Sequence, residues 1–168
     1  NLQIAKKLQE ELESRGISVL MTREEDKGLY DEDADNKQVQ DLKRRVELIN
    51  ETAPVLAVSI HQNSYPSPDV SGSQIFYFEH SKEGEEMANT VQKQIENLEG
   101  IKNRPIKGND TYYLLRRTEV PTMIIECGFL SNQEEATRLA EESYQETLAK
   151  AIADGIEECL RSAGSEND

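Results

Sequence analysis

Two polar residues with complementary chemistry each follow an apolar segment of the chain. His61, one of two histidines in the sequence, follows residues 55–58, and Glu126 follows residues 122–125. Both segments have the composition of buried strands, and ligands of open α/β sheets bind outside the carboxyl ends of the strands. We therefore expect the imidazole and the carboxylate to meet there. A histidine ligand and a glutamate base suit metal-assisted hydrolysis.

His61 also has a structural alternative, because a single histidine at a strand end is more often structural than a metal ligand. Its neighbours favour a solvated site, since Ser59, Asn63 and Ser64 place polar groups immediately after the apolar run. Asn63 and Ser64 are weak candidates for substrate contacts. The other histidine, His80, lies in an exposed turn and is assigned no role.

Glu126 is the more unusual residue, because apolar residues flank it and glutamate is rarely buried without a partner. Two interpretations remain open from residue chemistry alone. Either Glu126 forms a salt bridge with Arg116 or Arg117, or it is a general base whose pKa is raised by its surroundings. Gly128 indicates a tight turn at which the backbone closely approaches another group.

The two cysteines lack the spacing of a disulfide framework or of a zinc knuckle. Cys127 is a weak candidate nucleophile, because its carboxylate neighbour raises the thiol pKa and no histidine is close in sequence. We expect Cys159 to be a small buried hydrophobic residue.

The composition limits the class of protein. A chain of 168 residues is long enough for one domain with a single core. Its net charge of −14 argues against nucleic acid or an anionic bilayer as the main partner. No window contains the ~18 apolar residues of a membrane span. The scattered acidic residues are typical of a solvated surface.

Hydrophobic periodicity predicts helices that alternate with strands. Helices are expected over residues 2–15, 39–50 and 87–98, from Gln133 with Asn132 as N-cap, and from a capping box at Ser143 and Glu146. Strands are expected over residues 17–21, 54–61, 72–78 and 122–126, with a short strand or turn at 112–115. Residues 22–38 are expected to form a long loop.

This alternation predicts an α/β fold, a three-layer sandwich whose central sheet is mostly parallel or mixed and is flanked by helices. We expect the domain to span residues 1–162. Residues 163–168 are expected to form a disordered tail.

Four segments occur in an order and at a spacing that resemble one protein family. They are residues 21–26 (MTREED), 42–50 (LKRRVELIN), 59–64 (SIHQNS) and 120–132 (VPTMIIECGFLSN). Together they resemble the zinc-dependent N-acetylmuramoyl-L-alanine amidases of bacterial cell-wall turnover. The short, undecorated domain is most similar to the CwlD-like sporulation branch. The resemblance extends from Asn1 to about Leu160.

The resemblance implies a central, roughly six-stranded mixed sheet. It also implies zinc held by a histidine, a glutamate and a second histidine that falls on His61, with the catalytic glutamate on Glu126. The reaction of the family is hydrolysis of the amide between N-acetylmuramic acid and the L-alanine of the stem peptide. Asn132 is a weak candidate for a substrate contact and is better explained as a helix cap. Arg45 and Asn50 are expected to be scaffold residues.

The sequence departs from the family pattern at its start. The first strand and two metal ligands, a histidine and a glutamate, would lie upstream of Asn1. Because zinc sites need about three protein ligands, we expect the sequence to be an N-terminally truncated form of the domain. Cys127 replaces a small or leucine-type residue of the family, which should be tolerated.

The resemblance further implies peptidoglycan as substrate and a role in cell-wall remodelling or spore cortex maturation. It implies an extracytoplasmic location, in the cell wall, the periplasm or the forespore intermembrane space. The acidic loop over residues 23–38 could gate the site or dock an activating partner protein. The competing hypothesis is a catalytically incomplete fragment that binds peptidoglycan or a partner without hydrolysis.

Overall fold

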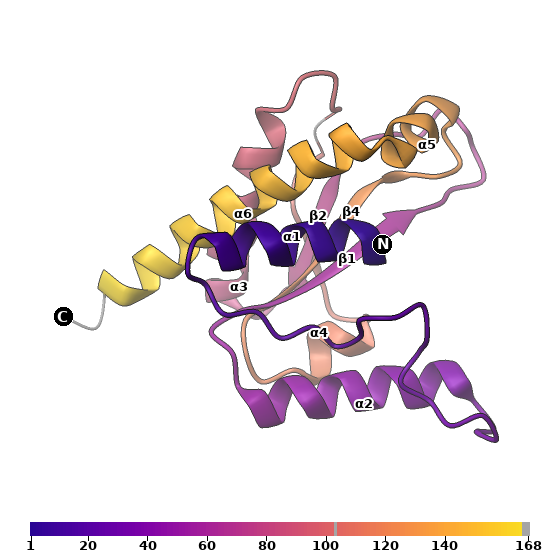
Figure 1. Cartoon of the computed structure of the whole chain (residues 1–168), viewed down its shortest axis with the longest axis vertical. Coiled ribbons are helices and arrows are strands. Elements are labelled where there is room, and N and C mark those ends of the chain that lie inside the picture. The colour runs from indigo at the N-terminus through magenta and orange to yellow at the C-terminus, as the bar shows by residue number, and fades with distance from the viewer. Residues whose placement is uncertain (103, 166–168) are drawn as a thin grey trace.

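The computed structural model describes residues 1–102 and 104–165 and has the predicted three-layer α/β architecture (Figure 1). Its helices are α1 (Leu2–Ser14), α2 (Lys37–Thr52), α3 (Lys82–Glu96), α4 (Tyr113–Arg117), α5 (Gln133–Ala140) and α6 (Glu142–Ser165). Its strands are β1 (Ala57–Asn63), β2 (Gln74–Phe78), β3 (Lys107–Asn109) and β4 (Thr122–Phe129). Within the described ranges, no helix combines the length and the apolar character that crossing a membrane requires.

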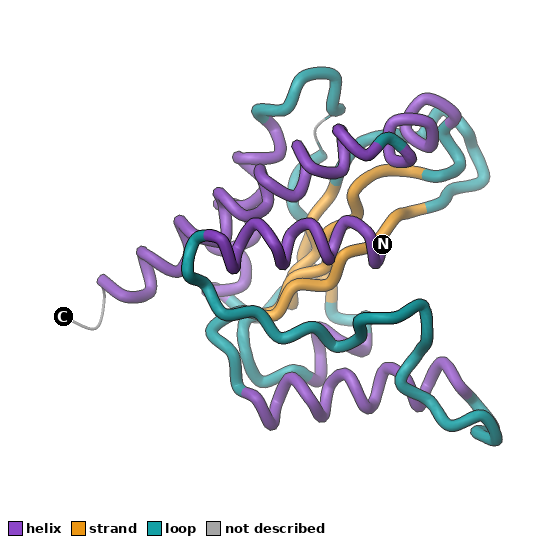
Figure 2. Tube along the Cα trace, viewed as in Figure 1, coloured by secondary structure: helices purple, strands orange, loops and turns teal. Residues whose placement is uncertain are grey.

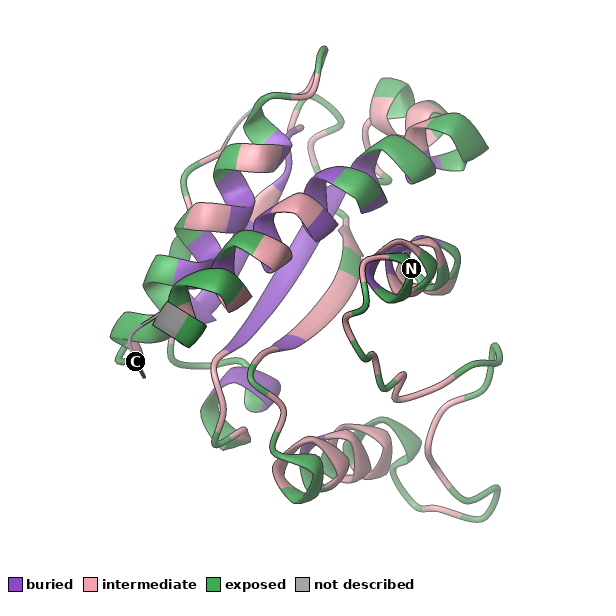
Figure 3. Cartoon of the chain, turned by 60° about the vertical axis from the view of Figure 1, so that its left-hand side comes forward, coloured by how far each residue is buried: buried purple, intermediate pink, exposed green. Residues whose placement is uncertain are grey.

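The described part of the sheet has four strands in the order β1-β4-β2-β3. β1 is parallel to β4, and β2 is parallel to β3, whereas β2 and β4 are antiparallel. The expectation of a mixed sheet is therefore confirmed, with fewer strands than the roughly six that the resemblance implied. β4 is buried along its whole length and lies beneath the helices in Figure 3.

The alternation of side chains along the strands builds one core on each face of the sheet. The larger core joins the sheet to α1, α3 and α6, and its fully buried side chains include Ile4, Val91, Ile125 and Ile152. The smaller core joins the other face to α2 and α4 through Val46, Phe76, Leu114, Leu115 and Ile124. Each fully buried side chain of this size contributes roughly 1.5–3 kcal/mol through loss of apolar surface to water.

The strand predicted at residues 17–21 does not form. Ile17 and Val19 pack against the larger core, but Leu20 is 59% exposed, and none of the described strands pairs with this segment. Burial of alternate side chains is therefore not enough to form a strand here, because a strand also needs backbone hydrogen bonds to a neighbouring strand. The segment instead opens the long loop between α1 and α2, which is teal in Figure 2.

That loop matches its prediction as far as Asn36, whose side chain accepts a hydrogen bond from the backbone N of Val39 (3.1 Å) and caps α2. The short strand or turn predicted at residues 112–115 is instead the start of helix α4. The side chain of Asn109 accepts hydrogen bonds from the backbone N of Thr111 (2.9 Å) and of Tyr112 (2.7 Å) and turns the chain at this point.

The last helix also begins differently from the prediction. α6 starts at Glu142, so Ser143 lies inside the helix and does not cap it. The helix continues to Ser165, into the segment expected to be a tail. Residues 166–168 of that expected tail lie outside the described residues.

Candidate active site

His61 and Glu126 are register partners in the parallel ladder of β1 and β4. On the other side of β4, Gln74 of β2 is the register partner of Glu126. Register partners point to the same face of a sheet, and neighbouring strands lie about 4.8 Å apart. The three side chains therefore form a row across three adjacent strands, which we call the reactive row. It lies on the face that carries the smaller core.

The carboxyl group of Glu126 is desolvated. The residue is 9% exposed, and its Oε2 is buried without a hydrogen-bond partner among the described residues. Burial raises the pKa of Glu126 above its ordinary value. The alternative of a salt bridge with Arg116 or Arg117 is not realised in the described part of the chain. Arg117 instead lies over the ring of Tyr113, at 5.9 Å from its centroid.

His61 is an exposed residue whose surroundings favour the neutral form of the imidazole. Surrounding protein partly desolvates the ring and lowers the pKa of His61, and the positive charges of Arg45, the Asn1 amine and Arg23 lower it further. Neutral imidazole is the form that binds a metal ion. Arg45 is itself held by Asp41, whose Oδ2 accepts from its Nε at 2.6 Å.

Asn50 stabilises the same side of the molecule. Its Nδ2 donates to the carbonyl of Arg117 (3.0 Å), and its Oδ1 accepts from the backbone N of Glu119 (2.9 Å). These contacts fix α2 to the segment that precedes β4. They agree with the expected scaffold role of Asn50.

Tyr112 is a neighbour of the reactive row that the sequence analysis missed. Its ring packs edge-on against Phe76 at 5.4 Å. Desolvation raises the pKa of Tyr112, and the charge of Glu126 raises it further. The phenol therefore lies within electrostatic reach of the Glu126 carboxyl. No local pattern in the sequence indicates this, because α4 brings the tyrosine to the sheet.

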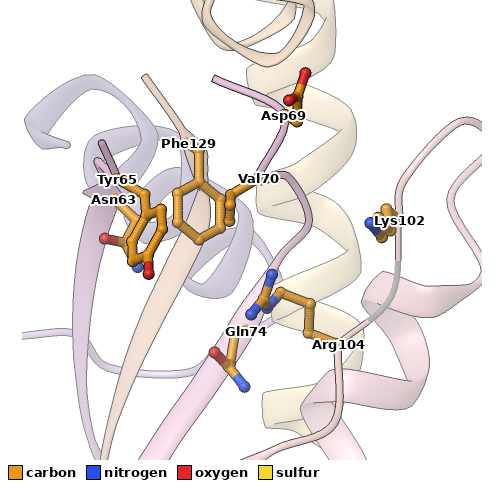
Figure 4. Close-up of a pocket in the computed structure, with 8 residues that line it drawn as sticks. All are labelled: Asn63, Tyr65, Asp69, Val70, Gln74, Lys102, Arg104 and Phe129. Atoms are coloured by element: carbon orange, nitrogen blue, oxygen red, sulfur yellow. The ribbon is translucent and has the colours of Figure 1, made fainter. Parts of the chain in front are cut away.

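A pocket of about 420 Å³ opens beyond the reactive row, at the ends of β1, β4 and β2 (Figure 4). It is lined by Asn63, Tyr65, Asp69, Val70, Gln74, Lys102, Arg104 and Phe129. Gln74 belongs to both the reactive row and the pocket. The pocket therefore adjoins the reactive row at Gln74.

The three weak candidates for substrate contacts differ in their positions. Asn63 lines the pocket, and its Oδ1 accepts from the backbone N of Ser64 (2.8 Å). Ser64 is exposed and does not line the pocket. Asn132 caps α5 by accepting from the backbone N of Glu135 (3.0 Å), and its Nδ2 donates to the carbonyl of Pro68 (2.8 Å). Both ends of its amide thus have structural partners.

The end of β4 is shaped by a bulge and by Glu135. Asn63 lies two residues after His61 in β1, whereas its register partner Phe129 lies three residues after Glu126 in β4. β4 therefore contains one extra residue at this point. The carboxylate of Glu135 accepts hydrogen bonds from the backbone N of Phe129 (2.7 Å) and of Gly72 (2.8 Å). A Cβ on Gly128 would lie 3.2 Å from this carboxylate, so the predicted close approach is confirmed, but the predicted tight turn is wrong because Gly128 lies within β4.

The cysteines and His80 stay outside the site. Cys127 alternates with Glu126 and packs into the larger core on the opposite face of the sheet. Burial, and then the charge of Glu126, raise the pKa of its thiol to about 12, so it does not act as a nucleophile. Cys159 is buried in the same core, as expected. His80 is exposed beside Glu79.

The described residues do not by themselves form a metal site. No group of three His, Cys, Asp or Glu side chains is arranged to hold a metal ion within residues 1–102 and 104–165. Zinc sites use about three protein ligands. His61 fits the role of one ligand, and the described residues group no two further ligands with it.

Comparison with known proteins identifies the family. Residues 1–158 match the family model described as N-acetylmuramoyl-L-alanine amidase (Amidase_3). The chain belongs to this amidase family. The amidase domain is 38% identical over 159 residues to the germination-specific N-acetylmuramoyl-L-alanine amidase of Bacillus subtilis, a match that covers 92% of this chain and 67% of the relative. The predicted family and enzyme class are therefore confirmed.

Solved structures agree with this assignment. The CwlD amidase of Clostridioides difficile, solved in complex with the GerS lipoprotein, matches with a TM-score of 0.91 and 37% identity, over 96% of this chain and 84% of that one. The amidase AmiC2 of Nostoc punctiforme matches with a TM-score of 0.82 and 31% identity, over 95% and 82% of the two chains. The likeness to CwlD agrees with the predicted branch of the family.

Proposed function

We propose that the protein containing this chain is a zinc-dependent amidase that hydrolyses the bond between N-acetylmuramic acid and L-alanine in peptidoglycan. The observation that supports this most is the register of His61 and Glu126, together with the unpartnered Oε2 of Glu126. Membership of the amidase family supports the substrate class. The germination-specific relative supports a role in spore cortex maturation or related wall remodelling.

In this proposal His61 provides one zinc ligand and Glu126 transfers the proton. Bound zinc would polarise the scissile carbonyl and lower the pKa of a water molecule toward ~7. Glu126 accepts the proton of the attacking water and donates it to the departing nitrogen of L-alanine. Its raised pKa suits this task, because the group must hold the proton between two steps.

We also infer an extracytoplasmic site of action and a partner protein. The wall polymer is the substrate class of the family, which supports the location. The similar CwlD amidase was solved in complex with the GerS lipoprotein, which supports a partner. The loop between α1 and α2 remains a candidate for docking that partner.

The decisive experiment is Glu126→Gln in the full-length, zinc-loaded protein. We expect amide cleavage of muropeptides to fall at least about 100-fold, because a proton-transfer group is lost, while the zinc content stays unchanged. Glu134→Gln is the matched control, since the side chain of Glu134 is 81% exposed on α5. Unchanged turnover in the Glu126 variant would remove this residue from the mechanism.

The alternative is a binding module that recognises peptidoglycan or a partner without hydrolysis. The observation that favours it is the incomplete ligand set of the described residues. Elemental analysis of the purified 168-residue chain tests it directly. Stoichiometric zinc would contradict this alternative, whereas metal-free protein that sediments with peptidoglycan would support it.

A further inference from the structure

The pocket beside the reactive row carries positive charge in a strongly acidic chain. The net charge is −14, yet the lining contains Lys102 and Arg104 against a single acidic residue, Asp69. Figure 4 shows the guanidinium of Arg104 pointing into the pocket, toward Gln74 and Phe129, with Lys102 and Asp69 farther out. The ionic group closest to the reactive row within the pocket is therefore a cation.

The guanidinium of Arg104 is held in a defined position. It lies over the ring of Phe129, at 5.5 Å from the centroid, and its Nη1 donates to the carbonyl of Ser71 (3.2 Å). Gln74 donates to the carbonyl of Pro105 (2.9 Å) and so ties the next residue of the same loop to β2. No carboxylate of the described residues forms an ion pair with Arg104.

These contacts leave most of the guanidinium available to a ligand. Arginine has five N–H donors in a planar fork that matches the geometry of a carboxylate. One donor is used by the carbonyl of Ser71, and the aromatic ring covers one face of the plane. The position therefore suits a carboxylate that enters from the side of the reactive row.

The part of the pocket at Asn63 and Phe129 lies about two residues along β1 from His61. Asn63 and Phe129 are the next register pair after His61 and Glu126, and two residues of a strand span about 6.6 Å. An extended peptide advances by about 3.3–3.6 Å per residue. An extended peptide that runs along β1 from a scissile amide at the reactive row would thus place its second residue in the pocket.

The charge of the substrate decides which of its sides fits. The carboxyl group of N-acetylmuramic acid is consumed in the amide bond, so the glycan side is uncharged there. The peptide side carries free carboxylates. We propose that the pocket binds the stem peptide and that Arg104 pairs with a free carboxylate on its second residue. This inference rests on the proposed function and adds a determinant of substrate specificity to it.

The test compares two synthetic muropeptides that differ only in whether the second residue carries a free carboxylate or a carboxamide. For the full-length, zinc-loaded protein we expect kcat/KM to be about 10- to 100-fold higher on the carboxylate form, since one charge-assisted pair is gained. Arg104→Gln should reduce this ratio to near one, mainly through KM. Arg161→Gln, at an exposed arginine of α6, is the matched control and should keep the ratio.

Two results would overturn the inference. The first is equal kcat/KM of the unchanged protein on both substrates. The second is an Arg104→Gln variant that loses activity on both substrates alike, as expected if Arg104 only supports the loop at Ser71. The comparison of substrates on the unchanged protein holds even if the variant folds poorly.

Calorimetric titration with the two peptide products separates this inference from the proposed function. Tighter binding of the carboxylate peptide by the unchanged protein supports the pairing with Arg104, and equal binding contradicts it, whether or not cleavage occurs. Failure to cleave either muropeptide would contradict the proposed function alone.

Discussion

His61 lies opposite Glu126 in the β1–β4 ladder, so backbone hydrogen bonds set their relative position. Groups on strands are placed more precisely than groups on loops. The register itself is fixed by burial, because Met123 and Ile125 alternate with Glu126 and are fully buried in the larger core. A slip of one residue would move the carboxyl group to the opposite face and remove Met123 and Ile125 from the larger core.

Glu135 joins the two chain segments that border the pocket, and its removal should destabilise the fold. Glu135→Ala leaves the backbone N–H groups of Gly72 and Phe129 without their acceptor. We expect the free energy of unfolding to fall by about 2 kcal/mol, measured by urea denaturation. The neighbouring Glu134→Ala loses only an exposed ion pair with Arg138 and should cost less than about 0.5 kcal/mol. Equal effects of the two variants would contradict this role of Glu135.

Gly72 occupies a position that other residues adopt with strain. Its φ is +111°, and an added Cβ would lie 2.5 Å from the carbonyl oxygen of Lys102. Gly16 also has a positive φ, +77°, but has open space around it. Gly72→Ala should therefore cost about 2 kcal/mol of unfolding free energy and Gly16→Ala about 1 kcal/mol. Urea denaturation measures both losses. If Gly72→Ala lowers the unfolding free energy less than Gly16→Ala does, the backbone near Lys102 moves to accommodate the added Cβ, which contradicts this prediction.

Asp41 ties the long loop to α2 and should make stability depend on pH. Its Oδ1 accepts from the backbone N of Leu29 (2.6 Å), and its Oδ2 from Arg45 (2.6 Å). Desolvation raises the pKa of Asp41, but the hydrogen bonds from Arg45 and Leu29 outweigh it, so the pKa is lower than usual. Such a carboxylate contributes stability above its unfolded-state pKa, and this is lost as the pH falls through the folded-state pKa.

Asp41→Asn should accordingly lower the unfolding free energy by about 1 kcal/mol at pH 7, and the difference from the unchanged chain should shrink on acidification toward pH ~3. Urea denaturation at both pH values measures it. Asp33→Asn, at an exposed position in the same loop, is the control and should have little effect at either pH. A difference that grows on acidification would mean that the assigned shift has the wrong sign.

Both cysteines should be protected from thiol reagents in the folded chain. Burial, with the charge of Glu126, raises the pKa of Cys127 to about 12, and burial raises that of Cys159 to about 11. Because the thiolate is the reactive form, we expect no reaction with Ellman's reagent at pH 8 until the chain is unfolded in guanidinium chloride. Fast labelling of either thiol in the folded chain would contradict the described burial.

Helices with regular apolar spacing could be predicted from the sequence alone. The stripe of Leu8 and Leu12 predicted α1, and both residues are buried in the larger core. The meeting of His61 with Glu126 was also predictable, because each follows an apolar run that has to be buried. Their direct register, by contrast, depends on the packing of β1 against β4.

Features set by distant partners could not be predicted. β3 consists of Lys107, Gly108 and Asn109, which have little strand propensity, and it forms because its backbone pairs with β2. The segment that begins at Tyr112 has strand-like composition, yet it becomes a helix after the turn capped by Asn109. The pocket likewise joins loops from separate parts of the chain.

The bulge in β4 determines which face of the sheet carries Phe129. The extra residue between Glu126 and Phe129 brings the phenyl ring to the same side as the carboxyl group; in a strand of regular pleat it would face away. If β4 were regularly paired here, with Gly128 opposite Asn63, Phe129 would face away from the carboxyl group and Arg104 would lose its aromatic support. The local pairing of β4 with β1 thus sets the position of the cation that we propose binds the stem peptide.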